Sequence, residues 1–339
     1  MTEDSSLPER IHGGPDQQGT PLHDFSTNSN ACGPCPDALA AVTQADATQY
    51  PDASYTALRE QLATFHGVDV QRIVLAASAS EFIFRITAVV ARQGALGVWL
   101  PPHSYGDYAQ AARAHGLQQT ADPEGAALRW ACDPSSPLGS AHDGLQALTA
   151  SPAAVTVLDR AYEPLRLSGS LALDTVQLQT VWQLYTPNKA LGLTGVRAAY
   201  AIAPMGSEDL VGALDQLCPS WPIGAHGVAM LQAWVSPDAQ AWLGDSLATL
   251  CEWKLQQVAV CESMGWRCLP SHANFFCALP ALPTTMDLQQ TLGALRAQGI
   301  KLRDTTSFGL PGHVRISVQP PAVQTGLRQA WQQLAKATA

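Results

Sequence analysis

The stretch LYTPNKALGLTGVRAAYAIA, residues 184–203, places one lysine in a turn between two apolar runs. The runs cover 181–186 and 197–203 and have the length and composition of strands. Lys189 lies in the turn, and Arg197 follows it at the start of the second run. A lysine in an apolar, partly buried setting loses its proton readily and can form a Schiff base with an aldehyde. The alternative interpretation is a surface lysine in a loop, and this stretch alone leaves both interpretations open.

Further apolar runs of strand length lie at 72–77, 96–101, 128–133 and 154–159, and helical patterns separate several of them. One such helix is predicted at 54–66. Another begins at Ser78, where Ser78 and Glu81 have the spacing of a capping box. This alternation predicts an α/β fold with a mostly parallel sheet covered by helices on both faces. After about residue 222, long helical patterns precede the short runs ANFFCAL, IKLRD and HVRISVQ, which predict a smaller α+β domain.

The composition of the 339 residues is that of a globular protein, with 46% hydrophobic and only 14% charged residues. So few charges suggest that a partner subunit covers part of the surface. The net charge of -9 argues against nucleic acid or an anionic membrane as the main partner. The first residues lack the apolar core of a signal peptide, and no apolar stretch is long enough to span a membrane. We therefore expect a cytoplasmic protein whose eight cysteines are reduced and hold no metal.

Residues suited to one cofactor follow the predicted strands. Asp159 ends the strand at 154–159, about thirty residues before Lys189. Pyridoxal phosphate needs such a carboxylate, because it keeps the pyridine nitrogen protonated and lets the ring accept electrons. The helix start at Ser78-Ala79-Ser80 offers free N–H groups to a phosphate, and Arg197 offers a charged donor. These residues favour pyridoxal phosphate as the cofactor.

Several blocks occur in the order typical of one enzyme family: IHGG, DFSTNSNACGP, YPDASYTALREQLATFHGV, PPHSYGDY, VLDRAY, TPNKALGLTGVRAAY, ANFF and LRDTTSFGLPGHVRISV. The chain resembles the fold-type I pyridoxal-phosphate enzymes of the class I/II aminotransferase group. Within that group it is most similar to histidinol-phosphate aminotransferases and to the threonine-phosphate decarboxylases of cobalamin synthesis. The resemblance implies a seven-stranded, mostly parallel sheet in a large domain at 49–222. It also implies an arm at 1–48 that joins a small domain at 223–339.

The resemblance implies a cofactor role for each matching residue. Lys189 forms the Schiff base and moves protons, Asp159 pairs with the pyridine nitrogen, and Tyr162 bonds the 3-oxygen of the ring. Tyr105 stacks on the ring. The phosphate is held by Ala79, Ser80, Thr186 and Arg197, and by Tyr50 reaching over from a neighbouring subunit. A homodimer with a shared active site is therefore expected.

The resemblance also implies a substrate side to the site. Arg315 clamps the substrate carboxylate, Arg303 takes that carboxylate or a distal phosphate, and Asn30 faces the carboxylate beside Arg315. Asn30 lies just before CGPC, residues 32–35, a string that thioredoxin-like oxidoreductases use for dithiol chemistry. The resemblance instead places CGPC in a turn that orients Asn30, so the two cysteines carry no redox role.

Four positions depart from the family pattern. Ser136 stands where an asparagine usually supports the 3-oxygen of the ring, and Arg160 replaces the acidic residue after Asp159. Asn188 replaces the serine before the lysine, and Ala31 replaces the proline after Asn30. We interpret the chain as an aminotransferase for a small amino acid or amine, with phosphorylated ones among the candidates. The alternatives are a threonine-phosphate decarboxylase-like enzyme and a non-catalytic dimeric protein, the last motivated by Ser136 and Arg160.

Overall fold

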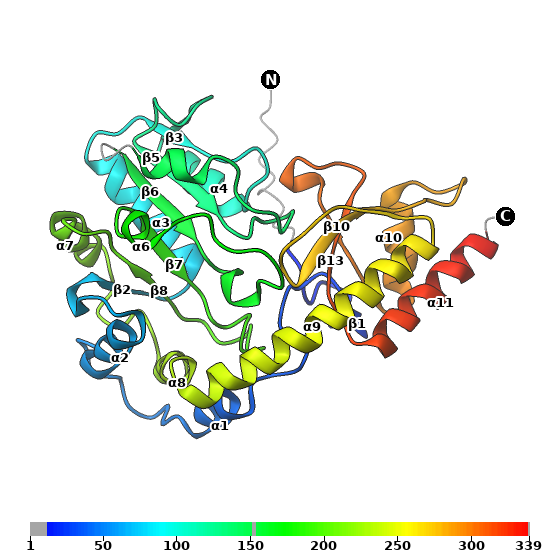
Figure 1. The fold of residues 1–339 in the computed structure, drawn as a ribbon, viewed down its shortest axis with the longest axis horizontal. Helices are drawn as coiled ribbons and strands as arrows, with labels where there is room; N and C mark the ends of the chain where they lie inside the picture. The colour runs from blue at the N-terminus through cyan, green and yellow to red at the C-terminus, as the bar shows by residue number, and fades with distance from the viewer. Residues whose placement is uncertain (1–11, 151–153, 338–339) are drawn as a thin grey trace.

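The protein is described by a computed structural model that covers residues 12–150 and 154–337. A seven-stranded sheet with helices on both faces adjoins a four-stranded antiparallel sheet (Figure 1). The α/β class and the mostly parallel seven-stranded sheet predicted from the sequence are confirmed. Residues 1–11 of the predicted arm and residues 338–339 of the predicted small domain lie outside the described residues.

The strands of the large sheet form from the apolar runs of the sequence. Their order across the sheet is β2 Ile73–Ala76, β8 Ala199–Ile202, β7 Trp182–Tyr185, β6 Val155–Asp159, β5 Leu128–Cys132, β3 Gly97–Trp99 and β4 Gln118–Gln119. Strand β8 runs antiparallel to β2 and β7, and the other neighbours pair in parallel. Each predicted run is found as a strand. The edge strand β4 is not among them, because its two exposed glutamines carry no apolar pattern.

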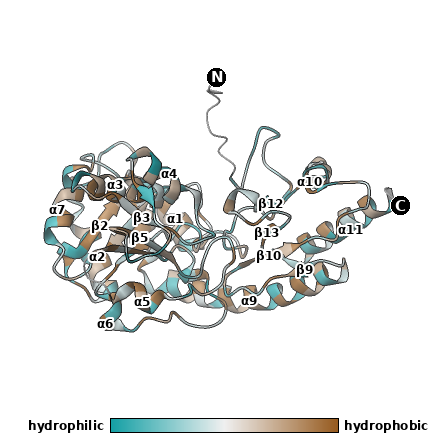
Figure 2. Ribbon diagram, turned by 90° about the horizontal axis from the view of Figure 1, so that it is seen from above, coloured by the Kyte–Doolittle hydropathy of each residue, from teal (hydrophilic) through white to brown (hydrophobic). Residues whose placement is uncertain are grey.

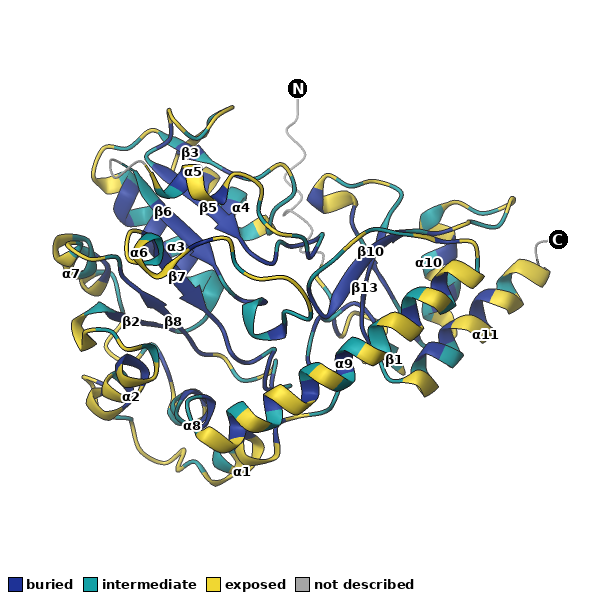
Figure 3. Ribbon diagram, in the orientation of Figure 1, coloured by how far each residue is buried: buried dark blue, intermediate teal, exposed yellow. Residues whose placement is uncertain are grey.

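Helices cover both faces of this sheet. One face packs against α3 Ala79–Arg92, α4 Gly106–Ala114 and α7 Glu208–Gln216, and the other against α2 Thr56–His66, α5 Leu145–Thr149, α6 Thr175–Leu178 and α8 Ala225–Trp234. Successive side chains of β8 alternate between the faces, with Ala199 and Ala201 on the first and Tyr200 and Ile202 on the second. The strands are therefore buried while the outer sides of the helices are exposed (Figure 3).

The start of α3 differs from the prediction in one detail. The Ser78 hydroxyl accepts a hydrogen bond from the Glu81 N–H at 3.1 Å, as expected of an N-cap. The Glu81 carboxylate, however, turns to the N–H of Ala77 and to the guanidinium of Arg85. The predicted capping box is thus half formed, because a buried arginine takes the carboxylate that would close it.

The second sheet has the order β12 Arg303–Asp304, β13 Val314–Ser317, β10 Phe275–Leu279 and β9 Arg267–Cys268. The remaining elements are β1 His23–Asp24, β11 Ile300–Lys301, α1 Pro36–Gln44, α9 Pro237–Ser263, α10 Leu288–Ala297, α11 Pro321–Ala337 and short 3-10 turns at 70–72, 163–165 and 306–308. Apolar and polar residues mix along α9 and α11 (Figure 2), and Val258, Cys261, Leu327 and Trp331 of these helices pack in the core beside this sheet. Strand β1 pairs in parallel with β11, which attaches the N-terminal arm here. The division at 48 and 222 stays a prediction.

Candidate active site

One edge of the large sheet gathers the polar residues predicted from the sequence. Strands β2, β3, β5, β6 and β7 all point their carboxyl ends to this edge, and the antiparallel β8 begins there. Ser80 in the first turn of α3 and Asp159 at the end of β6 lie at this edge. The loops there carry Tyr105, Ser136, Lys189 and Arg197. Ligands of open α/β sheets bind at this position.

A cavity of about 480 Å³ opens at this edge, within the range usual for small-molecule sites. Its wall includes most of the predicted site residues: Ala79, Ser80, Tyr105, Ser136, Asp159, Tyr162, Thr186, Lys189, Arg197, Arg303 and Arg315. No three histidines, cysteines or acidic residues within the described part of the chain are placed to hold a metal ion.

Asp159 is buried at the base of the cavity and is held by two donors. The Tyr108 hydroxyl donates to Oδ2 at 2.6 Å and the Ala161 N–H donates to Oδ1 at 2.8 Å. Burial raises the pKa of the Asp159 carboxyl, and both donors oppose that rise because they bind the charged form. Tyr108 is itself fully buried and stacks on Trp130 with 4.3 Å between ring centroids. Burial, together with the charge of Asp159, raises the pKa of Tyr108 well above its usual value, so its hydroxyl stays a donor.

Lys189 extends into the cavity beside Tyr162, with its Nζ 5.4 Å from the centre of the Tyr162 ring. The Tyr162 hydroxyl accepts a hydrogen bond from the Asn28 amide at 3.3 Å. The carbonyl oxygen of that amide is buried and has no partner among the described residues. Asn28 therefore offers the cavity a free acceptor next to the lysine.

The loop that carries Lys189 is tied by Asn188, one of the departures from the family pattern. The Asn188 carbonyl oxygen accepts from the Thr186 hydroxyl at 2.8 Å, and its amide donates to the carbonyls of Thr194 and Val196 at 3.4 Å. Asn188 therefore spans the turn from β7 to β8. A serine could not reach across this distance while also receiving the Thr186 hydrogen bond, so the substitution has a structural use here.

An anion-binding end of the cavity lies at the start of α3. The N–H groups of Ala79 and Ser80 belong to the first turn, where a helix supplies no acceptors of its own. The Tyr105 and Ser80 hydroxyls lie 3.3 Å apart. The Arg197 guanidinium forms no hydrogen bond or ion pair with residues 12–150 or 154–337. These groups together suit a phosphate.

Two buried arginines form the opposite wall. Arg303 on β12 and Arg315 on β13 are direct partners across the antiparallel pair. Phe308 lies under both guanidiniums, with its ring centre 4.8 Å from the Arg303 Cζ and 5.4 Å from the Arg315 Cζ. Burial, followed by the charge of Arg315, lowers the pKa of Arg303 to about 10. Both arginines line the cavity and present their positive charges to it.

Two hydrogen bonds hold Arg315, and its Nε donor remains unused. Its Nη1 donates to the Ser136 hydroxyl at 3.2 Å and its Nη2 to the Ser26 carbonyl at 3.3 Å. Its Nε is buried without a partner among the described residues. Ser136 thus lies in the cavity wall bonded to Arg315, and the support of the ring oxygen expected of this position stays a prediction.

Three predicted or singled-out residues lie outside the cavity. Tyr50 is 78% exposed and stacks on Trp221, away from the site of its own chain. Arg160 points to the other face of the sheet, where it donates to Gln183 and Tyr185. Asn30 is buried, and its amide bonds to the backbone of the lysine loop. The structure therefore places Asn30 beside Lys189 and brings Asn28, two residues earlier, to the cavity.

The two thiols of the CGPC turn are buried or half-buried. Cys35 is buried at the N-cap of α1, and the half-buried Cys32 thiol lies 3.8 Å from the Ser246 carbonyl. Burial raises the pKa of Cys32, which disfavours the thiolate that disulfide exchange needs. Gly33 has a φ of +97°, so this turn needs glycine at that position.

We expect the double variant Cys32→Ser, Cys35→Ala to keep turnover within about threefold of the parent, because burial disfavours the Cys32 thiolate and Cys35 is inaccessible in the core. Alanine at 35 removes the thiol and keeps a small apolar side chain at this buried position. The measurement is turnover with and without a thiol reductant. A parent enzyme that gains activity with reductant, and a double variant that does not, would reinstate the redox hypothesis.

Tyr108 and Asn28 were not predicted as site residues from the sequence, although the spacing of Tyr108 in the chain indicated a place near Tyr105. It follows Tyr105 by three residues in SYGDY, at the spacing that places two side chains on one face of a helix. His12, Gly13 and Cys132 also line the cavity and were not singled out.

Comparisons with known proteins give consistent results. The family model for aminotransferase class I and II matches residues 20–124 and 119–332. A histidinol-phosphate aminotransferase of Thiobacillus denitrificans is 28% identical over 323 residues, which cover 87% of this chain and 80% of the relative. The crystal structure of histidinol-phosphate aminotransferase from Sinorhizobium meliloti in complex with pyridoxal-5'-phosphate superposes with a TM-score of 0.77 and 22% identity, covering 92% and 90% of the two chains. The L-threonine-O-3-phosphate decarboxylase of Porphyromonas gingivalis superposes with the same TM-score of 0.77 at 20% identity, covering 92% and 99%.

Proposed function

Because the chain belongs to the aminotransferase class I and II family, we propose that it is a pyridoxal-phosphate-dependent aminotransferase for a small amino acid or amine that carries a second anionic group. One observation carries the proposal: a single cavity joins Lys189 and Asp159 to the buried pair Arg303 and Arg315. The first two residues suit the cofactor, and the arginine pair suits an anionic substrate.

The residues of the cavity fit pyridoxal phosphate. When bound, this cofactor supplies an aldehyde that exchanges amines and a ring that accepts electrons. Asp159 would pair with the ring nitrogen. Arg197, which has no partner among the described residues, would hold the phosphate together with the first turn of α3. The Tyr162 hydroxyl, already bonded to Asn28, would face the ring oxygen. Lys189 would provide the amine that binds the aldehyde.

The chain's own residues would also carry out the proton transfers. The Lys189 amine, on its flexible side chain beside Tyr162, would take the proton from the α-carbon of the substrate and hold it on Nζ. The Arg315 guanidinium, which lines the cavity, would orient the substrate carboxylate through its Nη groups. Arg303 would bind that carboxylate or a distal phosphate, which fits the phosphorylated substrate named for the relative from Thiobacillus denitrificans.

A second function, decarboxylation of a phosphorylated amino acid, has one observation in its favour. His12 and Gly13 line the cavity and belong to the HGG stretch that resembles the decarboxylases. An added Cβ at Gly13 would lie 2.2 Å from the Ser26 carbonyl oxygen, so glycine is required where this segment crosses the substrate wall. Both reactions use the same lysine, aspartate and arginines.

A substrate panel separates these functions. Purified protein with pyridoxal phosphate is incubated with histidinol phosphate, phosphothreonine and common amino acids, and keto product is scored against released CO₂. Keto product supports the aminotransferase, and stoichiometric CO₂ supports the decarboxylase. Neither product from any amine, together with no visible absorbance from bound cofactor, would support the non-catalytic alternative.

We further propose that the active enzyme is a homodimer. The exposed pair Tyr50 and Trp221 supports this, because Tyr50 cannot serve its own chain's cavity from the surface. Mixing inactive Tyr50→Phe and Lys189→Ala subunits tests the shared site, since a mixed dimer regains one intact site.

No helix among the described residues has the length and apolarity to cross a membrane. The cytoplasmic location stays a prediction.

We expect Tyr108→Phe to weaken cofactor binding about tenfold, because it removes one donor from the buried Asp159 carboxylate. Losing this donor raises the pKa of Asp159 further, so the carboxylate becomes protonated at a higher pH than in the parent. The loss of affinity should therefore be largest at acidic pH and shrink as pH rises. Titration of the cofactor-free protein with pyridoxal phosphate between pH 5 and 9 measures it. An affinity loss independent of pH would contradict this role.

A further inference from the structure

We propose that Asn30 is a positioning residue that fixes the lysine loop through its backbone, and that it does not bind substrate. The inference rests on the proposed function only in naming Lys189 as the reactive amine. Asn30 is 3% exposed and is not part of the cavity wall. Hydrogen bonds of its backbone and side chain to the lysine loop fix its position instead.

Three consecutive carbonyls of the lysine loop receive hydrogen bonds from the N-terminal arm. The Asn30 N–H donates to Lys189 O at 2.9 Å, and its side-chain amide donates to Ala190 O at 3.1 Å. The Cys35 N–H donates to Leu191 O at 2.9 Å. The remaining oxygen of the Asn30 side chain accepts from the Cys32 N–H at 3.0 Å, which fixes the amide's orientation. We call these four bonds the arm clamp.

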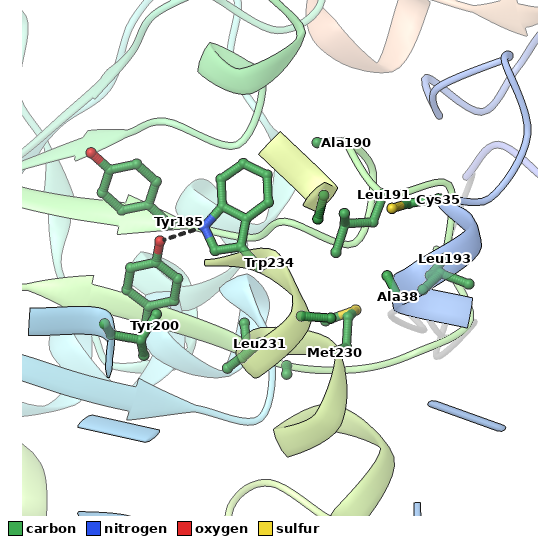
Figure 4. Packing of buried hydrophobic residues seen from close by; sticks show 14 of the residues in the cluster. Cys35, Ala38, Tyr185, Ala190, Leu191, Leu193, Tyr200, Met230, Leu231 and Trp234 are labelled. Atoms are coloured by element: carbon green, nitrogen blue, oxygen red, sulfur yellow. Dashed lines mark hydrogen bonds between the residues drawn. The ribbon is translucent and has the colours of Figure 1, made fainter. Parts of the chain in front are cut away.

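Close packing supports the arm clamp. Gly192 has a φ of +69°, and an added Cβ there would lie 2.6 Å from Gly33 O. Cys35 is fully buried in the cluster that holds Leu191 and Leu193 (Figure 4). The arm and the lysine loop therefore touch along their backbones without space for relative movement.

Within the lysine loop, few hydrogen bonds hold the carbonyls that face the arm. Its own bonds run from the N–H groups of Leu191, Gly192 and Leu193 to the carbonyls of Pro187, Lys189 and Asn188. The carbonyl of Ala190 has the Asn30 amide as its hydrogen-bond donor. A displacement of about 1 Å at a reacting group is enough to slow catalysis strongly. Loss of the clamp should therefore slow the chemical step and leave substrate binding intact.

The test compares Asn30→Ala and Asn30→Asp with the matched control Cys32→Ser. The aspartate keeps the acceptor for Cys32 N–H and the shape of the side chain, but it sets an oxygen against Ala190 O. The Cys32 side chain makes no hydrogen bond to the lysine loop. We expect kcat to fall about tenfold in both Asn30 variants, with KM within about twofold and with the control unchanged.

Hydrogen exchange of the cofactor-free protein provides a measurement independent of turnover. Amides of residues 188–193 should exchange faster in both Asn30 variants, while amides of β5 and β6 keep the parent rates. If the parent shows no turnover on any substrate, the proposed function fails but the exchange result still decides the arm clamp.

Other outcomes would overturn the proposal. A large rise in KM with unchanged kcat assigns Asn30 to substrate binding, as expected from the family resemblance. Parent-like exchange in residues 188–193 removes the clamp. Asn30 variants that are unfolded at 25 °C, judged by circular dichroism, assign Asn30 to folding of the whole domain and equally reject a local positioning role.

Discussion

Replacing Lys189 with alanine should abolish turnover, by about a thousandfold or more, and remove the visible absorbance of the bound cofactor. The lysine is the only amine in the wall of the cavity that could bind the aldehyde covalently, among the residues the structure describes. Its side chain extends into the cavity, and the loop is held by backbone bonds and by Asn188. The fold should therefore survive, with a circular dichroism spectrum like that of the parent.

The chain offers a matched control in Lys254. This lysine is half-buried on α9, outside the cavity, and its ammonium donates to the carbonyls of Ser271 and Ala273 at 2.6 and 2.7 Å. Burial lowers the pKa of Lys254 to about 8, so it is a reactive amine in its own right. Lys254→Met should lower thermal stability and keep the visible absorbance.

Borohydride reduction of the holoenzyme locates the covalent link directly. Peptide mass mapping should find the reduced cofactor on Lys189 and not on Lys254. A label on Lys254, or a Lys189→Ala variant that keeps visible absorbance and turnover, would show that the reactive lysine has been assigned to the wrong loop.

The sheet and the residues Asp159, Lys189 and Arg197 could be predicted from local patterns, whereas the substrate-side arginines came only from the family resemblance. Apolar runs mark the strands, and parallel strands bring the residues after their carboxyl ends to one edge. Asp159 and Lys189 follow two such runs, so their meeting requires only that β6 and β7 be neighbours. Arg160 follows the same logic, since the residue after Asp159 in an extended chain must point to the opposite face.

The roles of the N-terminal arm could not be read in this way. Asn28 and Asn30 lie in a polar, turn-rich segment without periodicity, where nothing in the sequence states which amide faces the cavity. Hydrogen bonds from Asn30 and Cys35 to the distant carbonyls of Lys189, Ala190 and Leu191 determine which amide faces the cavity. Tyr108 had the right helical spacing, but only the packing of α4 on Trp130 brings its hydroxyl to Asp159.

Replacing Arg315 with alanine should reduce kcat/KM for carboxylate substrates about 30-fold to several thousandfold. The guanidinium is 7% exposed, and losing one partner of a buried charge pair costs on the order of 2–5 kcal/mol. Affinity for pyridoxal phosphate should change far less, because Arg315 lies across the cavity from the start of α3. An unchanged kcat/KM would remove Arg315 from the substrate clamp.

Arg315→Lys separates the charge of the arginine from its shape. A lysine keeps the positive charge but cannot bond the Ser136 hydroxyl, the Ser26 carbonyl and a carboxylate with one planar fork. If geometry orients the substrate, Arg315→Lys should lose nearly as much kcat/KM as Arg315→Ala.

Comparing Arg303→Ala on substrates with and without a phosphate then completes the assignment. A loss confined to the phosphorylated substrate places Arg303 at the distal anion, and an equal loss on both places it at the carboxylate beside Arg315, its partner across β12 and β13.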